Sequence, residues 1–521
     1  MTRESKLMAV DATPLIESCA QRGARWSALL EVREGPRGRG VFAKQAIAHN
    51  DLLLRLPLSM MIHPPDKLAE MVASGECSKI LALALTVVHG LHVSSPRTKF
   101  FDLLAASPPP DLPMLWDSAS LEHLSGTSLL PPDVRAADVA AAAERIFEED
   151  VRPMMVAAGE TYLPTATHRR DIFTAALAWV SSRTLQGRMS YEHGAAGAGG
   201  LLPYLRADGP PTSSKPGGVG PFLLPLFDLI NHSTEPAPRN TILERVDGDG
   251  RADGDGNALD AFEMRATRDI AAGQEVVHSY GDHGPAELLR TYGFIDSSRH
   301  VGLSFAHDEV TRAATSALAR AGVALSARDA QQRLGALARA GRLPPLFTVR
   351  GGAPGTEGPA TQPAAVPTEL LTAVQVLCLD AEEYSGWLEA GSIWLGIDFL
   401  DDECLPVVQD CLLRLADDRL RTLAAGCGDD HGENGDGGGG GVAAELGQSL
   451  RAAEGTLLRD FKKGALLLDA SLGAEGETEE EGEEDEDEDE DEDEEEEEEE
   501  ELVEDSDTDS SRTGRKRIRV A

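Results

Sequence analysis

The sequence lacks three features that would each assign it to a class of protein. Its six cysteines, at positions 19, 77, 378, 404, 411 and 427, include no CxxC pair, which argues against a structural zinc and indicates reduced thiols in an intracellular protein. No apolar run reaches the roughly 18 residues of a membrane helix, and the N-terminus has no apolar signal segment, so we expect neither a membrane protein nor a secreted one. A basic stripe is also missing, so we do not expect direct nucleic-acid binding.

Acidic charge is abundant, but it is concentrated near one end. The net charge is −41, and residues 475–509 contain 28 acidic residues and no Lys or Arg. Residues 1–474 are only moderately acidic, with a net charge of −18. Because such a run cannot bury apolar surface, we predict that residues 471–521 form a disordered acidic tail with a basic C-terminus.

This tail has three possible roles. It can be a solubilising segment, or it can attract basic protein substrates such as ribosomal proteins or histones electrostatically. The basic run Gly514–Arg519 can also act as a nuclear import signal. We therefore predict a nuclear or cytoplasmic protein, or one found in both compartments.

The remaining sequence divides into strand-like and helical stretches. A length of 521 residues predicts two ordered domains plus tails. Short apolar runs between turn residues predict strands at 28–32, 40–43, 51–57, 221–229, 241–246 and 258–264. Helical spacing is found at 81–88, 99–104, 138–147 and 170–185, and after residue 294 at 309–321, 327–340, 369–379, 406–423 and 445–468.

Two of the apolar runs end abruptly on polar residues beside tight turns. The first ends in Asn231-His232, and the second ends in Ser279-Tyr280-Gly281. Polar side chains at buried strand ends must find partners. We therefore predict one site that is assembled from both strand ends.

Several short motifs follow one another in a fixed order. They are Gly38–Ala43, Ser181–Arg183, Asp228–His232, Ile270–Val276, Ser279–Gly281 and Tyr292–Phe294. As an ordered set they resemble the SET-domain methyltransferases, and within them the subgroup of Rubisco large-subunit and ribosomal-protein lysine methyltransferases. The resemblance covers about residues 22–296 and, more loosely, the helical region to about residue 470.

The resemblance implies an α+β fold with four parts. These are an N-terminal arm (1–21), a β-rich SET domain with a pseudoknot (22–296) and a helical insertion at about 65–195, an all-helical substrate-binding-like domain (297–470) with flexible loops at 350–366 and 426–441, and the disordered acidic tail (471–521). In the family, the Asn-His strand end and the Tyr-Gly segment thread past one another.

The resemblance also implies site residues and a cofactor, S-adenosyl-L-methionine. The expected cofactor-binding residues are Arg37, Gly38, Arg39, Arg183, Asp228, Leu229, Ile230, Asn231, His232, Tyr292, Gly293 and Phe294. An arginine can meet the cofactor carboxylate with a fork of hydrogen bonds. Tyr280 and Tyr292 are the expected catalytic residues, since a dry aromatic channel favours the neutral amine of a target lysine. Taken singly, Tyr280 could be a packing residue, Arg183 a surface charge and His232 a core histidine.

The predicted function is S-adenosylmethionine-dependent N-methylation of lysine in a protein substrate, by an enzyme that acts as a monomer and needs no metal. Two alternatives remain. One is a protein-histidine methyltransferase; relatives of that kind carry Asn two positions after the arginine, where this chain has Leu185. The other is a non-catalytic SET-fold protein that binds basic partners. Pro285, which stands where relatives often have Asn, favours this second alternative; Asn231, His232 and Tyr280 oppose it.

Overall fold

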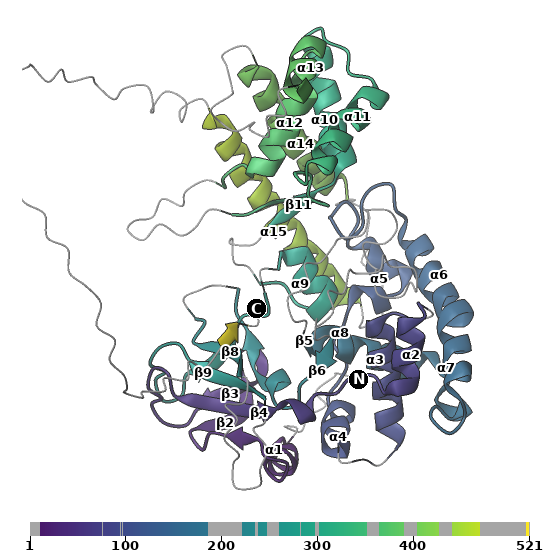
Figure 1. Ribbon diagram of the computed structural model, residues 1–521, viewed down its shortest axis with the longest axis vertical. Helices are drawn as coiled ribbons and strands as arrows, with labels where there is room; N and C mark the ends of the chain where they lie inside the picture. The colour runs from purple at the N-terminus through teal and green to yellow at the C-terminus, as the bar shows by residue number, and fades with distance from the viewer. Residues whose placement is uncertain are drawn as a thin grey trace, which may run out of the picture.

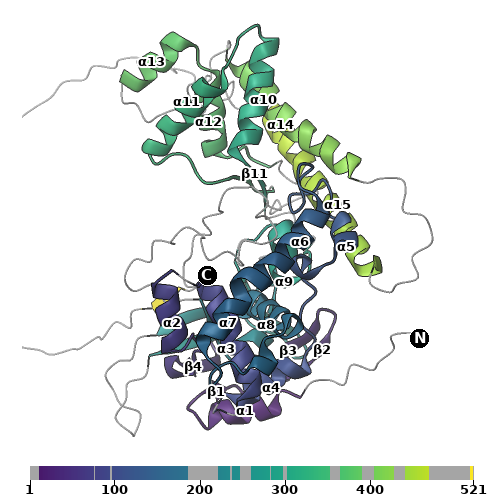
Figure 2. The ribbon, with the colours of Figure 1, turned by 90° about the vertical axis from the view of Figure 1, so that its right-hand side faces the viewer.

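The protein is described here from a computed structural model. It describes residues 11–75, 77–93, 95, 97–185, 221–234, 238–246, 260–281, 283–296, 302–351, 364–389, 404–426, 440–468 and 517–519. Two bodies are visible in Figures 1 and 2: a lower body of sheets and helices, and an upper body of helices, with α15 (Gly440–Leu466) reaching from one to the other. Among the described helices, none is long and apolar enough to cross a membrane.

The lower body contains two larger sheets among the described residues. The first has the order β1 (Arg25–Trp26), β4 (Leu52–Pro57), β9 (Ala261–Ala266), β8 (Thr241–Val246) and β13 (Arg517–Arg519). The second has the order β2 (Leu30–Gly35), β3 (Gly38–Ala43), β10 (Glu275–His278) and β7 (Asn231–His232). The strands predicted around residues 28–57 and 241–264 are thereby confirmed, although the exact bounds differ by a few residues.

Helices inserted between β4 and the later strands pack beside these sheets (Figure 1). They are α2 (Asp66–Ala73), α3 (Lys79–His92), α4 (Thr98–Ala106), α5 (Ser118–Glu122), α6 (Ala136–Ile146), α7 (Arg152–Ala158) and α8 (Arg170–Arg183), with a short π-helical segment, η3 (Phe147–Val151), before α7. Helix α3 is buried on nearly every face, which is typical of a helix that is apolar all round. The Ser78 hydroxyl caps it by accepting from the backbone N–H of Leu81.

The strand predicted over residues 221–229 is wrong. The structure has only β6 (Phe222–Leu223), paired with β5 (Thr184–Leu185), and then a 3₁₀ turn, η5 (Phe227–Leu229). Pro225 explains the break, because proline cannot donate to a sheet ladder. Leu226 follows with a positive φ of 72° and a fully buried side chain, so packing holds the chain in a conformation that leucine rarely adopts.

The upper body is mostly helical, as predicted. It contains α10 (His307–Arg320), α11 (Ala327–Arg339), α12 (Thr368–Cys378), α13 (Ala381–Glu389) and α14 (Leu405–Ala425). The prediction of an all-helical domain is wrong in one detail, since β11 (Leu303–Phe305) pairs antiparallel with β12 (Phe347–Val349). Of the two predicted loops, 350–366 and 426–441, the central residues 352–363 and 427–439 lie outside the described residues.

Both predicted terminal segments contain regular structure. Helix α1 (Thr13–Ala20), in the expected N-terminal arm, buries Leu15 and Cys19 in the core of the lower body. In the expected disordered tail, Arg517–Arg519 form β13 and pair antiparallel with β8. The rest of the tail lies outside the described part of the chain.

Helix α15 joins the two cores, and this was not predicted. Its side chains Ala443 and Leu450 belong to the core of the lower body, whereas Leu458 and Phe461 belong to the core of the upper body. Between them, the buried Glu454 carboxylate accepts from the backbone N–H of Ser128 at 3.2 Å and from the Ser128 hydroxyl. One helix therefore fixes the upper body against the insertion.

Glu454 provides a pH-dependent test of this junction. Because burial raises the pKa of its carboxyl, the carboxyl stabilises the fold fully below the unfolded pKa, and this stabilisation is lost as pH rises through the folded pKa. We expect Glu454→Gln, which keeps an acceptor for Ser128, to gain free energy of unfolding relative to wild type as pH rises from about 4 to about 8. Urea denaturation at several pH values measures this. For Glu445→Gln, an exposed change on the same helix, the difference in free energy of unfolding from wild type should not vary with pH. If the difference for Glu454→Gln does not vary with pH either, the raised pKa assigned to Glu454 is wrong.

Candidate functional site

The two polar strand ends do lie together. Strand β10 pairs with β7 in parallel, with Val277 opposite Asn231 and His278 opposite His232. The pairing continues past the strands, where the Ser233 N–H donates to the carbonyl of His278 at 3.0 Å. Since parallel strands end at the same edge of a sheet, Asn231-His232 and Ser279-Tyr280 emerge side by side.

Asn231 ties three strands together. Its side-chain amide donates to the Arg39 carbonyl on β3 at 3.1 Å and to Glu275 Oε1 on β10 at 2.8 Å. Gly40 gives the room for this contact, because a Cβ there would lie 2.7 Å from the Asn231 amide nitrogen and 2.6 Å from the Glu275 oxygen. A glycine at this position is thus required by close packing.

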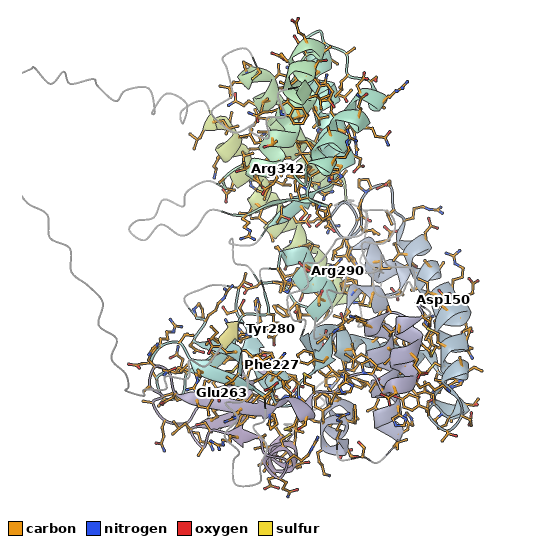
Figure 3. All side chains as sticks on the ribbon, in the orientation of Figure 1. Asp150, Phe227, Glu263, Tyr280, Arg290 and Arg342 are labelled. Atoms are coloured by element: carbon orange, nitrogen blue, oxygen red, sulfur yellow. The ribbon has the colours of Figure 1, made fainter. Side chains whose placement is uncertain are left out.

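We call the place where β7 and β10 end side by side the crossing. Tyr280 reaches back across it to β7. Its hydroxyl donates to the Ile230 carbonyl at 2.8 Å, and its backbone N–H donates to His232 Nδ1 at 2.9 Å. Burial raises the pKa of Tyr280, so the hydroxyl keeps its proton and stays a donor at neutral pH. The residue is half-buried and is labelled in the lower body in Figure 3.

His232 is a neutral, oriented imidazole. Because its Nδ1 accepts from Tyr280, the proton is on Nε2, which donates to Thr234 Oγ1 at 3.0 Å. Burial is the largest cause that lowers the pKa of His232, to about 3. The Thr234 N–H in turn donates to Asp296 Oδ2 at 3.0 Å, which connects the crossing to the chain after helix α9 (Pro285–Tyr292).

Four rings form a continuous cluster beside the crossing. The ring centroids of His232 and Tyr280 are 4.9 Å apart, as are those of Tyr280 and Tyr292, and Phe294 lies 6.0 Å from Tyr292. Tyr292 and Phe294 flank Gly293, which ends α9 in the left-handed conformation at φ 79°. The predicted residues from three separate stretches of sequence therefore meet.

Arg183 and Asp228 form a buried ion pair next to these rings. Arg183 ends α8, and its Nε lies 3.5 Å from Asp228 Oδ2, while the Asp228 side chain is 2% exposed. Burial raises the pKa of Asp228 and lowers the pKa of Arg183, and each charge opposes that effect on the other. Neither Asp228 oxygen nor Arg183 Nε has a hydrogen-bond partner within the described chain, although buried polar atoms normally do.

The three predicted turn residues lie at different depths. The Arg39 side chain donates to the Ser107 hydroxyl at 3.1 Å, and its carbonyl accepts from Asn231. Arg37 is at the rim, with its Nη1 3.3 Å from Glu275 Oε2 and its side chain 44% exposed. Gly38 has a φ of 82° with open space around it.

Several residues of the site were not predicted from the sequence. Glu275, Thr234, Asp296 and His283 each contact a predicted residue. Glu275 stands inside one of the recognised motifs, and its charge on an otherwise apolar strand was the available signal. The other three each follow the end of a motif by two positions.

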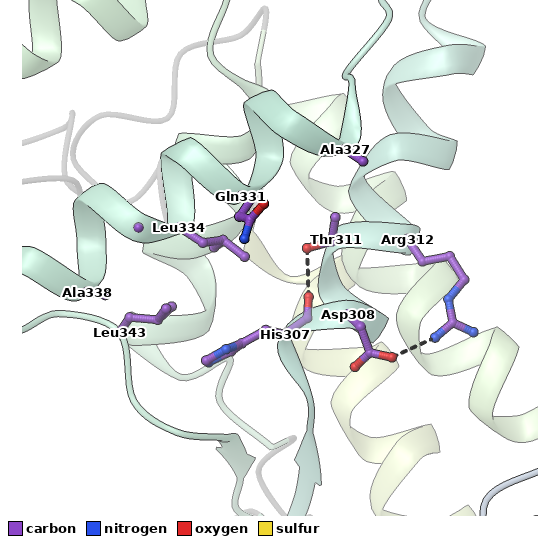
Figure 4. Close-up of a pocket in the computed structure, with 10 residues that line it drawn as sticks. His307, Asp308, Thr311, Arg312, Ala327, Gln331, Leu334, Ala338 and Leu343 are labelled. Carbon is purple, nitrogen blue, oxygen red and sulfur yellow. Dashed lines mark hydrogen bonds and ion pairs between the residues drawn. The ribbon is translucent and has the colours of Figure 1, made fainter. Parts of the chain in front are cut away.

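A separate cleft lies in the upper body. It measures about 500 Å³, lies between α10 and α11 and is lined by His307, Thr311, Gln331, Leu334 and Leu343 among others (Figure 4). None of the predicted site residues lines it. This cleft is open and its polar lining includes Asp308 and Arg312, whereas the crossing of β7 and β10 brings polar strand ends together beside a buried ion pair. The crossing is therefore the better candidate for chemistry.

Comparisons with known proteins agree with this geometry. Residues 38–281 match the family model described as the SET domain. The chain is 22% identical over 268 residues to the N-lysine methyltransferase setd6 of Xenopus tropicalis and 23% identical over 267 residues to SETD6 of Rattus norvegicus. These alignments cover 49% and 50% of this chain and 50% and 48% of the relatives, so the chain spans about half the length of the curated relatives that it matches.

A solved structure shares the fold. It is described as the SET domain of LSMT bound to lysine and AdoHcy. The two chains align with a TM-score of 0.51 and 16% sequence identity, over 92% of this chain and 98% of that one.

Gly40 provides a direct test of the crossing. We expect Gly40→Ala to lower the free energy of unfolding by about 1–3 kcal/mol, because the new methyl group would displace Asn231 and Glu275. Urea denaturation measures this. The matched control is Gly386→Ala on α13, where an added Cβ would meet no neighbouring atom within 4 Å. Helix propensity predicts that this change raises the free energy of unfolding by about 0.5–1 kcal/mol. Equal stability of Gly40→Ala and wild type would contradict the described packing.

Proposed function

We propose, from the SET domain that residues 38–281 form, that this chain is an S-adenosylmethionine-dependent protein-lysine N-methyltransferase. The observation that carries the proposal is the placement of Tyr280. Its hydroxyl is held by the Ile230 carbonyl at the crossing of β7 and β10, against the ring of Tyr292. The curated relatives, which are N-lysine methyltransferases by name, support the same activity.

The residues at the crossing fit the proposed cofactor. Besides their mutual ion pair, Arg183 and Asp228 present buried polar atoms that lack a hydrogen-bond partner in the described chain, and they suit the carboxylate and ammonium of an amino-acid moiety. The neutral His232 and the backbone at Asn231 offer hydrogen bonds, and the rings of Tyr292 and Phe294 can cover an adenine. Arg39 and Gly38 form one wall of the same region. The solved SET domain of LSMT contains AdoHcy and lysine, which supports both ligands.

The chemistry requires little beyond positioning and exclusion of water. When bound, the cofactor supplies a methyl group on a positively charged sulfur, which the lone pair of an amine can attack in line. The target ammonium must first lose a proton, and the aromatic surroundings of Tyr280 and Tyr292 favour the neutral amine by desolvating the charged form. Because the Tyr280 hydroxyl donates to Ile230, its oxygen lone pair is available to accept from the amine and orient it.

Lysine is the better target than histidine. Leu185, at the position where the histidine-specific pattern would have Asn, lies in β5 and pairs with Phe222. An apolar residue there gives no hydrogen bond to hold an imidazole in one tautomer. A flexible amine that enters an aromatic channel needs no such partner.

For the substrate we propose a basic protein, such as a ribosomal protein or a histone. The acidic run 475–509 would raise its encounter rate in a salt-dependent way. We further propose that the protein is a monomer. On the basis of the basic run Gly514–Arg519, we propose that it is located in the nucleus, the cytoplasm or both.

Tyr280→Phe tests the proposed function. Removing the hydroxyl should lower kcat by about 10²-fold, the usual cost of losing one positioned polar group in a transition state. The measurement is transfer of labelled methyl groups from S-adenosylmethionine into a cell lysate, followed by identification of the methylated residue. Tyr384→Phe, a buried tyrosine of the upper body, is the control and should label like wild type. Equal labelling by Tyr280→Phe would refute the role of this hydroxyl.

A further inference from the structure

His283 lies between Tyr280 and the first turn of α9. It is only 7% exposed. Its Nε2 is 3.0 Å from the Tyr280 carbonyl oxygen, and its Nδ1 is 3.1 Å from Glu287 Oε2. The ring therefore connects the end of the crossing directly to the helix that carries Tyr292.

Both partners of this ring accept hydrogen bonds. A backbone carbonyl has no hydrogen to donate, and an ionised carboxylate has none either. A histidine that donates to both must carry a hydrogen on each nitrogen and a positive charge. The ion pair with Glu287 provides the compensating negative charge, and charge-assisted hydrogen bonds are stronger than neutral ones.

The surroundings support this charge state. Within the described chain, the titratable and charged groups around the ring include Glu287, Arg290 and Tyr292 on α9, and His232 and Tyr280 at the crossing. The Arg290 guanidinium lies 3.7 Å from the second oxygen of Glu287, so this carboxylate faces two cations.

The local sequence explains why a histidine serves here. Pro285 opens α9 and has neither a backbone N–H nor a polar side chain, so it cannot hold the Tyr280 segment. Gly284 before it is packed against the backbone, since a Cβ there would lie 2.3 Å from the Gly302 carbonyl oxygen. His283 is the adjoining position with a side chain, and Gly281 makes room for its ring.

We propose that His283 is a positioning residue for methyl transfer. As a doubly donating imidazolium it fixes the Tyr280 backbone to Glu287 on α9, and thereby sets the position of the Tyr280 hydroxyl relative to the Tyr292 ring. The inference rests on the proposed function for its catalytic consequence, whereas the hydrogen-bonded clamp itself does not.

The clamp is tested without any turnover. Nuclear magnetic resonance of the ring nitrogens in the full chain should show both nitrogens of His283 protonated at neutral pH. Glu287→Gln should abolish this signature, because the ring then loses the charge that holds its second proton. A singly protonated His283 in the wild-type protein would overturn the proposal whether or not the protein transfers methyl groups.

Kinetics then test the positioning role. We expect His283→Phe, which keeps a ring but no hydrogen bonds, to lower kcat about 10-fold with KM for S-adenosylmethionine changed less than about two-fold. His283→Gln, which can still donate to Tyr280, should recover part of the loss. His307→Phe is the matched control, since His307 Nε2 also contacts a carbonyl, that of Pro344 at 2.7 Å, in the upper body; its kcat should not change.

Two results separate the possible failures. If His283→Phe lowers the melting temperature as His307→Phe does but leaves kcat unchanged, His283 is structural and the positioning role is wrong. If wild type transfers no methyl group at all, the proposed function is wrong, and the nitrogen spectrum still decides whether the clamp exists.

Discussion

The parallel pairing of β7 with β10 is the constraint on which the site depends. Both strands are short. The polar backbone and side-chain groups at the end of each strand need hydrogen-bond partners. Those partners come from the other strand: Tyr280 donates twice to β7 and its neighbour Ile230, and Asn231 donates to β10 and β3. Satisfying the polar groups of the crossing thus also builds the site.

The crossing is connected to the rest of the molecule through α9. His283 and Glu287 link its first turn to Tyr280, and its last turn presents Tyr292 to the ring cluster. Helix α9 also packs against α15, which is embedded in both cores. A series of packed elements therefore leads from the upper body to the two tyrosines.

Much of this arrangement follows from the sequence. The short apolar runs around residues 28–57 predict β2, β3 and β4 because turn residues separate them, and Asn231-His232 and Tyr280 could be assigned to one site because polar strand ends must be satisfied. The 3₁₀ turn at Phe227–Leu229 could have been inferred from Pro225. The bridging by α15 could not, because apolar periodicity indicates which face is buried but not which partner covers it. His283 was missed for a similar reason: its two acceptors are defined only by the tertiary fold.

The central claim is that the crossing of β7 and β10 binds the methyl donor. The most direct measurement is calorimetric titration of the full chain with S-adenosylhomocysteine. One ligand per chain is predicted, with binding lost in Asn231→Ala, which removes the amide that ties β7 to β3 and β10. Absence of binding to a folded wild-type chain would contradict the account.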